Sequence, residues 1–168
     1  TGMNAIYPVS PTSLAAAAFN LKDPTSFEIT WYNSPTHATT GITGDGSTMY
    51  GDTGYNPNSE GDDVNDFGLT ISAEDKTGGY AIGSSSGTNR TGFRYNGTAK
   101  ISYLGVISSF LQVTNNAEFV NTIVRRSSTD QEMYVEGSSI GSNSTLNTGA
   151  APTQPIYVMC YNSGGTPA

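Results

Sequence analysis

Acidic side chains gather in one short stretch, and they are the first residues in this sequence that could do chemistry. Residues 60–66 read Glu-Gly-Asp-Asp-Val-Asn-Asp, and two more aspartates, Asp45 and Asp52, come shortly before them. A hard cation such as Ca²⁺ takes several oxygen ligands from carboxylates, amides and carbonyls, on a loop that glycine allows to bend. The pattern predicts a calcium site. The expected ligands are Asp62, Asp63, Asn65 and Asp66. In the alternative interpretation each of these side chains caps its own turn, as Asp and Asn commonly do.

A second group of residues has the chemistry to bind sugars. Glycans are held by aromatic rings beside amides and carboxylates that hydrogen-bond their hydroxyls, and tyrosine combines an apolar ring with a polar tip. In the alternative interpretation the same tyrosines pack across strands, which stabilises a sheet equally well. The candidate glycan-binding residues are Tyr50, Tyr55, Asn56, Asn58, Tyr95, Asn96, Tyr161 and Asn162.

Catalytic constellations are missing from the sequence. Retaining glycoside hydrolysis needs two carboxyl groups about 5 Å apart, whereas the expected strands carry single glutamates. Glu132 and Glu136 are evenly spaced and could share a face, but they sit on a hairpin beside a turn, and we interpret them as a solvated face. His37 is the only histidine, and because no Gly-x-Ser-x-Gly motif is present we interpret it as an exposed loop or strand-edge residue and not as the general base of a nucleophilic triad. A three-histidine zinc site is impossible with one histidine. We predict no enzymatic activity and no required cofactor.

The composition restricts the classes of partner. The 168 residues suffice for one domain with its own core. Only 12% are charged and the formal net charge is −7, which argues against nucleic acid, because binding phosphates requires clustered Lys and Arg. No apolar run approaches the roughly 20 residues of a membrane-spanning helix, so we expect no membrane insertion. The single cysteine, Cys160, excludes an internal disulfide, and we expect it to be a buried apolar residue.

The elements that position these residues are expected to be short strands. Phe67, Leu69, Ile71 and Ala73 alternate with Gly, Thr and Ser, which is typical of a half-buried strand. Further strands are expected at residues 27–31, 80–83, 92–95, 100–104, 118–126, 131–136 and 156–161, and only residues 11–19 suggest a helical turn. About eight short strands separated by polar turns predict an antiparallel sandwich. The expected core comprises Phe27, Ile29, Trp31, Leu69, Ile71, Ile101, Phe119, Ile123, Val135 and Val158.

One hairpin is especially well defined. Residues 119–126 and 131–135 flank the sequence Ser-Ser-Thr-Asp, whose side chains bond their own backbone in turns. Gly137, at the end of the second strand, permits the positive φ of the next reversal.

The same hairpin carries a resemblance to a known family. A strand ending in Arg126, a polar turn and then Met-Tyr-Val-Glu-Gly at 133–137 resembles a hairpin of laminin-G-like and concanavalin A-like jelly rolls. Residues 40–58, TGITGDGSTMYGDTGYNPN, are similar to laminin-G-like modules in structural proteins of tailed bacteriophages, as is the segment 156–167. The resemblance implies an all-β fold, a two-sheet antiparallel jelly-roll sandwich over residues 25–168, with residues 1–24 as an N-terminal arm or linker containing a short helical turn.

Such modules continue beyond the segment at 156–167 with one further strand. We expect that strand from Ala5–Val9 or from a partner chain, unless the sequence is a fragment. Laminin-G-like modules often bind one calcium ion at a sheet edge, which is a second reason for the expected calcium site.

The resemblance also implies a function. We expect a non-enzymatic structural or adhesive module of a virion (a phage fibre, tail or capsid decoration protein) that contacts host surface glycans. Its partners would be further copies of the chain or other virion proteins. One alternative is a carbohydrate-binding, lectin-like module of a secreted or cell-surface bacterial protein. A less favoured one is a glycoside hydrolase of the concanavalin A-like class, which the missing carboxyl pair opposes.

Overall fold

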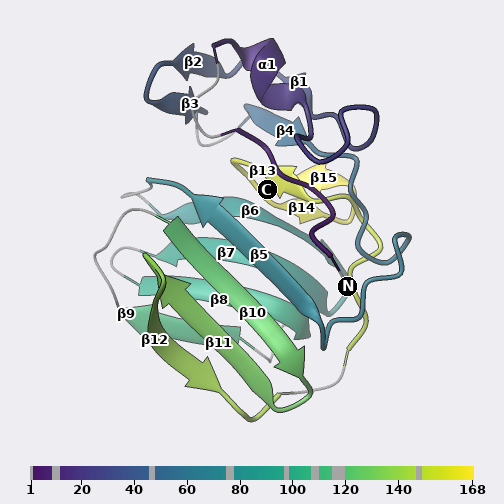
Figure 1. The fold of residues 1–168 in the computed structure, drawn as a ribbon, viewed down its shortest axis with the longest axis vertical. Helices are drawn as coiled ribbons and strands as arrows, with labels where there is room; N and C mark the ends of the chain where they lie inside the picture. The colour runs from purple at the N-terminus through teal and green to yellow at the C-terminus, as the bar shows by residue number, and fades with distance from the viewer. Residues whose placement is uncertain are drawn as a thin grey trace.

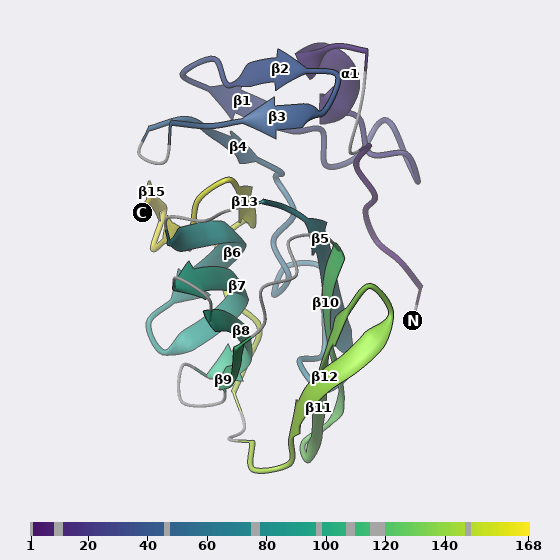
Figure 2. The ribbon, with the colours of Figure 1, turned by 90° about the vertical axis from the view of Figure 1, so that its left-hand side faces the viewer.

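The computed structural model describes residues 2–8, 12–45, 48–74, 78–96, 99–106, 110–114, 120–146 and 149–168. It is nearly all β, with 50% strand and 3% helix, which confirms the expected all-β class. Two sheets face each other as the layers of a sandwich, and the short helix and first strands lie at one end (Figures 1 and 2).

The larger sheet has the strand order β1-β4-β13-β6-β7-β8-β9, and β14 and β15 extend it beside β6. Its pairings are antiparallel except that of β14 with β6, which is parallel. The strands are β1 (Thr30–Tyr32), β4 (Tyr50–Asp52), β6 (Gly79–Ser86), β7 (Asn89–Asn96), β8 (Ala99–Val106), β9 (Phe110–Thr114), β13 (Tyr157–Val158), β14 (Asn162–Ser163) and β15 (Thr166–Pro167).

The smaller sheet is fully antiparallel, in the order β12-β11-β10-β5. Alternate residues of its strands face the larger sheet: on β11, Gln131, Met133 and Val135 are buried while the residues between them are partly exposed. Its strands are β5 (Phe67–Ser72), β10 (Val120–Ser127), β11 (Asp130–Val135) and β12 (Ser138–Asn143). A separate hairpin of β2 (Thr36–Ala38) and β3 (Gly41–Thr43) lies near helix α1 (Leu14–Ala18) (Figure 1).

The predicted hairpin is present as β10 and β11, which pair with Ile123 opposite Met133 and Ser127 opposite Asp130. Glu136 and Gly137 have φ values of 51° and 76° and turn the chain into β12. Glycine at the second position accepts that backbone without strain. Several short strands were not predicted, namely β2, β3, β4, β9, β12, β14 and β15.

The core lies between the two sheets. Its centre is a cluster of Tyr55, Ile82, Phe93, Leu104, Leu111, Ile123, Met133 and Ile156. Of the predicted core, Ile29, Ile101, Ile123 and Val135 are buried, whereas Phe27, Leu69, Ile71 and Val158 are half-buried and pack against the cluster. Phe119 and the expected strand start at Glu118 lie outside the described residues.

Trp31 corrects one prediction, because it is only partly buried. It lies on β1, the last strand at one edge of the larger sheet, where no further strand covers it. Its indole Nε1 donates a hydrogen bond to the Leu14 carbonyl at 3.0 Å, so the ring attaches the short helix to the sheet edge.

The N-terminal residues fold back along the segment after the helix. Asn20, fully buried, accepts a hydrogen bond from the Ile6 N–H at 3.0 Å, and the Leu21 N–H donates to the Ile6 carbonyl at 2.8 Å. Residues 5–8 form no strand, and Val9 lies outside the described residues. The described part of residues 5–9 therefore does not supply the further strand that the resemblance led us to expect.

Candidate functional site

The acidic stretch expected to bind calcium forms turns between β4 and β5. Asp62 is partly buried and accepts hydrogen bonds from the Asn4 amide at 3.1 Å and from the Tyr55 hydroxyl. This carboxylate therefore joins the N-terminal segment to a core tyrosine. Burial and the hydrogen bond to Asp62 raise the pKa of Tyr55 well above its usual range.

The other three expected ligands have separate contacts. Asp63 accepts the Asn65 backbone N–H at 2.8 Å, and the Asn65 side-chain oxygen accepts a hydrogen bond from Arg125 Nε at 3.2 Å. Asp66 is exposed, and its N–H donates to the Asp63 carbonyl at 2.9 Å. In the described part of the chain, no three Asp, Glu, His or Cys residues are grouped so as to hold a metal ion. Calcium binding stays a prediction, and these contacts favour the turn-capping alternative.

Four of the eight glycan candidates are enclosed by the protein. Tyr55, Tyr95 and Tyr161 are 6%, 4% and 3% exposed, and Asn162 is fully buried. The Tyr95 hydroxyl accepts a hydrogen bond from the Asn121 amide at 3.1 Å. These contacts favour the packing interpretation for all four.

The other four candidates lie nearer the surface but not together. Tyr50 is half-buried, and its ring stacks between Tyr32 and Tyr157, with ring centroids 4.6 and 4.8 Å away. Asn56 is half-buried and caps a turn by accepting the Asn58 N–H at 3.1 Å. The two exposed candidates are Asn58 and Asn96.

The evenly spaced glutamates do not act as a pair. Glu136 accepts the Val120 N–H at 2.8 Å, while Glu132 belongs to a different hydrogen-bonded group described below. His37 lies on β2 opposite Ile42, in the small separate hairpin. Cys160 is half-buried rather than fully buried as expected, and burial raises the pKa of its thiol to about 12, so the thiolate form is disfavoured at neutral pH.

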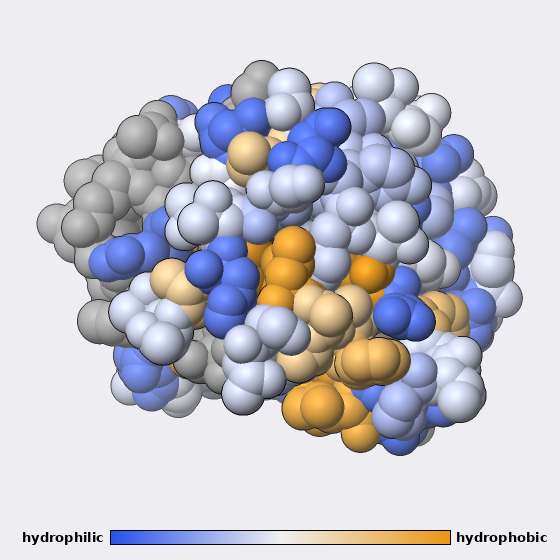
Figure 3. Space-filling model, turned by 90° about the horizontal axis from the view of Figure 1, so that it is seen from above, coloured by the Kyte–Doolittle hydropathy of each residue, from blue (hydrophilic) through white to orange (hydrophobic). Residues whose placement is uncertain are grey.

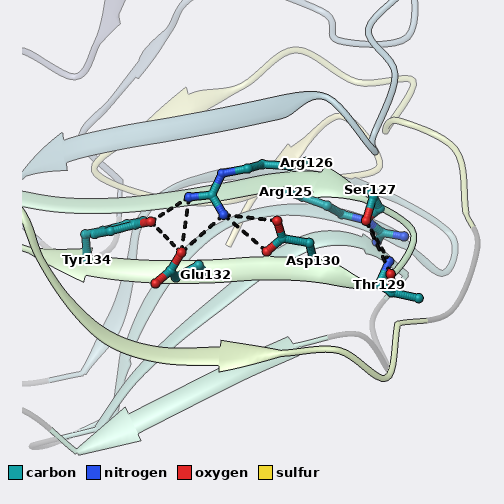
Figure 4. Close-up of polar contacts among 7 residues, drawn as sticks. All are labelled: Arg125, Arg126, Ser127, Thr129, Asp130, Glu132 and Tyr134. Carbon is teal, nitrogen blue, oxygen red and sulfur yellow. Dashed lines mark hydrogen bonds and ion pairs between the residues drawn. The ribbon is translucent and has the colours of Figure 1, made fainter.

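Arg126 holds a compact polar cluster on the outer face of the β10–β11 hairpin. Its guanidinium donates to both Asp130 oxygens at 3.1 Å, to Glu132 at 3.1 Å and to the Tyr134 hydroxyl at 2.5 Å (Figure 4). Hydrogen bonds from Ser139 and Tyr134 lower the pKa of Glu132. The arginine thus has carboxylate partners within its own hairpin, and Arg125 points away from this cluster.

A different arrangement lies on the outer face of the larger sheet, the side turned away from the smaller sheet (Figure 2). Core residues Phe93, Leu104 and Leu111 face inward, so the residues that alternate with them face outward. We call the outward group the Arg–Tyr face. It consists of Tyr80, Arg90, Arg94, Tyr103 and Phe110 on strands β6 to β9, together with Tyr161, whose ring stacks on that of Tyr80.

Arg90 is held between aromatic rings at the centre of the Arg–Tyr face. Its guanidinium carbon lies 5.0 Å from the ring centroids of both Tyr103 and Tyr161, within the range of cation–π attraction. Its Nη1 donates to the Tyr80 hydroxyl at 3.0 Å, and the Tyr80 and Tyr161 rings stack with centroids 4.2 Å apart. Tyr161 can lie flat here because Gly83 beneath it has no side chain.

The row of rings continues to both sides of Arg90. Arg94 lies over the Tyr80 ring with its guanidinium carbon 5.6 Å from the centroid. Phe110, on the edge strand β9, is 43% exposed and lies 6.2 Å from the Tyr103 centroid. On this face Phe110 is exposed and Tyr80 is half-buried, whereas the Tyr103 and Tyr161 rings are buried beneath the two arginines and their neighbours.

Within the described residues, neither Arg90 nor Arg94 has a carboxylate partner, in contrast to Arg126. The Nε–H of Arg90 is shielded from solvent and has no hydrogen-bond acceptor. The sequence held a signal that we did not use: no Asp or Glu occurs between Asp75 and Glu118, although the net charge is −7. Strands β6 to β9 fall entirely within that acid-free stretch.

Apolar side chains are exposed elsewhere on the N-terminal segments. The end of the molecule that carries α1 and β1–β4 shows apolar atoms gathered among polar ones (Figure 3). Leu21 and Ile6, joined by a backbone hydrogen bond, are 59% and 40% exposed, and Met3 and Phe19 are 61% and 42% exposed.

Comparison with family models, with curated proteins and with solved structures finds no match for this chain. In the part of the chain that the structure describes, no helix has the length and apolar character needed to cross a bilayer.

Proposed function

We propose that this chain is a non-enzymatic structural and adhesive module of a virion, a phage fibre, tail or capsid decoration protein, with a jelly-roll sandwich over residues 25–168. It contacts host surface glycans through the Arg–Tyr face. The sequence resemblance to laminin-G-like modules supports the virion setting and the jelly-roll topology. The two facing antiparallel sheets are compatible with that topology.

The single observation that carries the adhesive role is the Arg–Tyr face itself. Protein interiors normally enclose aromatic rings, yet Phe110 is 43% exposed, and Tyr80 and Arg94 are partly exposed on the same face of the sheet. Aromatic rings with polar tips provide flat apolar platforms for sugar rings. Hydroxyl and amide side chains of Gln112, Thr114 and Asn96 are exposed on the same strands and can bond sugar hydroxyls.

The experiment is a binding screen of the purified protein against a panel of neutral and acidic oligosaccharides, with hydrolysis products measured in parallel. The expected result is binding without turnover. Phe110→Ala should weaken that binding, whereas Tyr32→Ala, which removes a 41% exposed ring on β1, should not. Binding that survives Phe110→Ala, or release of shorter saccharides, would contradict the proposal.

Assembly with further copies of the chain, or with other virion proteins, is part of the same proposal. Light scattering on the purified protein tests the first of these: a dimer or trimer supports the virion setting. A monomer favours the alternative location, a secreted or cell-surface bacterial protein that would use the same glycan-binding face.

A further inference from the structure

We infer that the Arg–Tyr face selects acidic saccharides, chains whose sugar rings carry carboxylates, and that Arg90 and Arg94 recognise those carboxylates. This inference rests on the proposed glycan-binding function and specifies its ligand class.

The first argument is charge. Arg90 and Arg94 lack carboxylate partners among the described residues, and the strands around them contain no Asp or Glu. A guanidinium presents a planar set of N–H donors that matches a carboxylate in a bidentate geometry. In a chain of net charge −7, the Arg–Tyr face offers an anion two arginines that no described carboxylate neutralises.

The second argument is pre-organisation. Tyr103 and Tyr161 hold the Arg90 guanidinium between their rings, and the Tyr80 hydroxyl accepts from its Nη1. An arginine fixed in this way loses less conformational entropy when a ligand binds than a free one would.

The third argument is spacing. Arg90 and Arg94 are four residues apart on β7, so their backbone positions are about 13 Å apart along one face of the strand. Both guanidinium groups contact Tyr80, Arg90 at its hydroxyl and Arg94 over its ring, so one saccharide chain can place a carboxylate at each of them. The aromatic side chains of Tyr80, between the two arginines, and of Phe110, on the edge strand, contact the sugar rings themselves.

Nucleic acid fits this face less well than a saccharide. Nucleic-acid affinity comes from neutralising many phosphates, and two arginines on a protein of net charge −7 supply too few such contacts.

The test is isothermal titration of the full chain with a galacturonic acid hexasaccharide and with the same hexasaccharide fully methyl-esterified. Esterification keeps the sugar backbone and removes the charges, so the two ligands are matched. We expect the acidic form to bind at least tenfold more tightly, and we expect salt to weaken its binding.

The variants are Arg94→Gln and Arg90→Gln, with Arg126→Gln as the matched control on the outer face of the other sheet. We expect the first two to lose about tenfold in affinity for the acidic form and most of the preference for the acid over the ester, whereas Arg126→Gln should bind both ligands as the original chain does. Arg94→Lys should be intermediate, since it keeps the charge and loses the planar donors. Circular dichroism confirms that each variant is folded.

Three results would overturn the inference. If the ester binds as tightly as the acid, the Arg–Tyr face recognises sugar rings and not carboxylates. The inference then fails while the adhesive function stands. If inorganic polyphosphate competes as well as the acidic saccharide, the arginines are a general anion site. If neither hexasaccharide binds, the inference fails, and the oligosaccharide panel described above decides separately whether the adhesive function stands.

Discussion

Arg125 and Arg126 are neighbours in the sequence with opposite surroundings, and replacing each in turn tests the two-layer architecture. Arg125 is 1% exposed and points between the sheets, whereas the Arg126 side chain is 47% exposed. We predict that Arg125→Ala destabilises the protein several times more than Arg126→Ala does.

The magnitude for Arg125 follows from its contacts. Its Nη1 donates to the buried Leu104 carbonyl at 2.8 Å, and its Nε donates to the Ser127 carbonyl at 3.2 Å. Leaving a buried acceptor unpaired costs about 1–3 kcal/mol, and removing a long buried side chain adds a cavity cost of about 2 kcal/mol or more. We expect a total of about 4 kcal/mol.

The magnitude for Arg126 is smaller because water replaces its partners. Exposed ion pairs contribute about 0.2–1 kcal/mol, so Arg126→Ala should cost at most about 1 kcal/mol. For a domain of this size each kcal/mol shifts the melting temperature by roughly 2–4 °C. The expected decreases are therefore about 8–16 °C for Arg125→Ala and under about 4 °C for Arg126→Ala.

The assay is thermal unfolding followed by circular dichroism, with urea unfolding to obtain free energies. Arg125→Met separates the two contributions, because methionine fills most of the space and donates no hydrogen bond. It should lose about 2 kcal/mol from the unpaired acceptor. Equal losses for the two alanine variants would refute the burial argument, and an Arg125→Met protein as stable as the original would show that these hydrogen bonds contribute no net stability.

Three further predictions concern stability. A Cβ at Gly92 would overlap a backbone carbonyl of β6, so Gly92→Ala should lower the free energy of unfolding in urea by about 3 kcal/mol. A Gly92→Ala protein as stable as the original would contradict the close approach of β6 and β7. Burial raises the pKa values of Cys160, Tyr157 and Tyr161 from 9–10 to about 12. Above about pH 9 the unfolded chain loses these protons while the folded chain keeps them, so the free energy of unfolding should be constant up to about pH 9 and fall between pH 9 and 12. An unchanged urea midpoint at pH 11 would contradict this. If Asp62, Asp63, Asn65 and Asp66 hold calcium, millimolar Ca²⁺ should raise the melting temperature by several degrees over that measured with chelator, and coincident curves would support the turn-capping alternative.

The hairpin of β10 and β11 could be predicted because its signals are local. Alternating apolar residues and a turn of Ser, Thr and Asp specify two paired strands wherever the rest of the chain lies. The edge strands β9 and β12 were missed because their strand character does not come from a local pattern. The β12 sequence is rich in Ser and Gly, and its strand character comes from pairing with β11 and not from its own residues.

The candidate site was harder to predict because burial depends on distant segments. Tyr161 follows a short strand and was expected at the surface, but the stacked Tyr80 ring and Arg90 enclose it. No local pattern reports that contact, since it joins residues about eighty positions apart. The even spacing of Arg90 and Arg94 indicates that both side chains lie on the same face of a strand. The stretch without Asp or Glu around them indicates that these arginines have no acidic neighbours in the sequence.

The position of β13 has a consequence for how the protein is made. Tyr157 and Val158 pair with β4 on one side and with β6 on the other, so this late segment joins the first strands of the larger sheet to the rest of it. A ribosome releases β4 and β6 long before it reaches residue 157, and until then these strands have no neighbour between them. Completion of the sheet therefore waits for the C-terminal segment to emerge, and the smaller sheet, whose strands are all available earlier, can form first during synthesis.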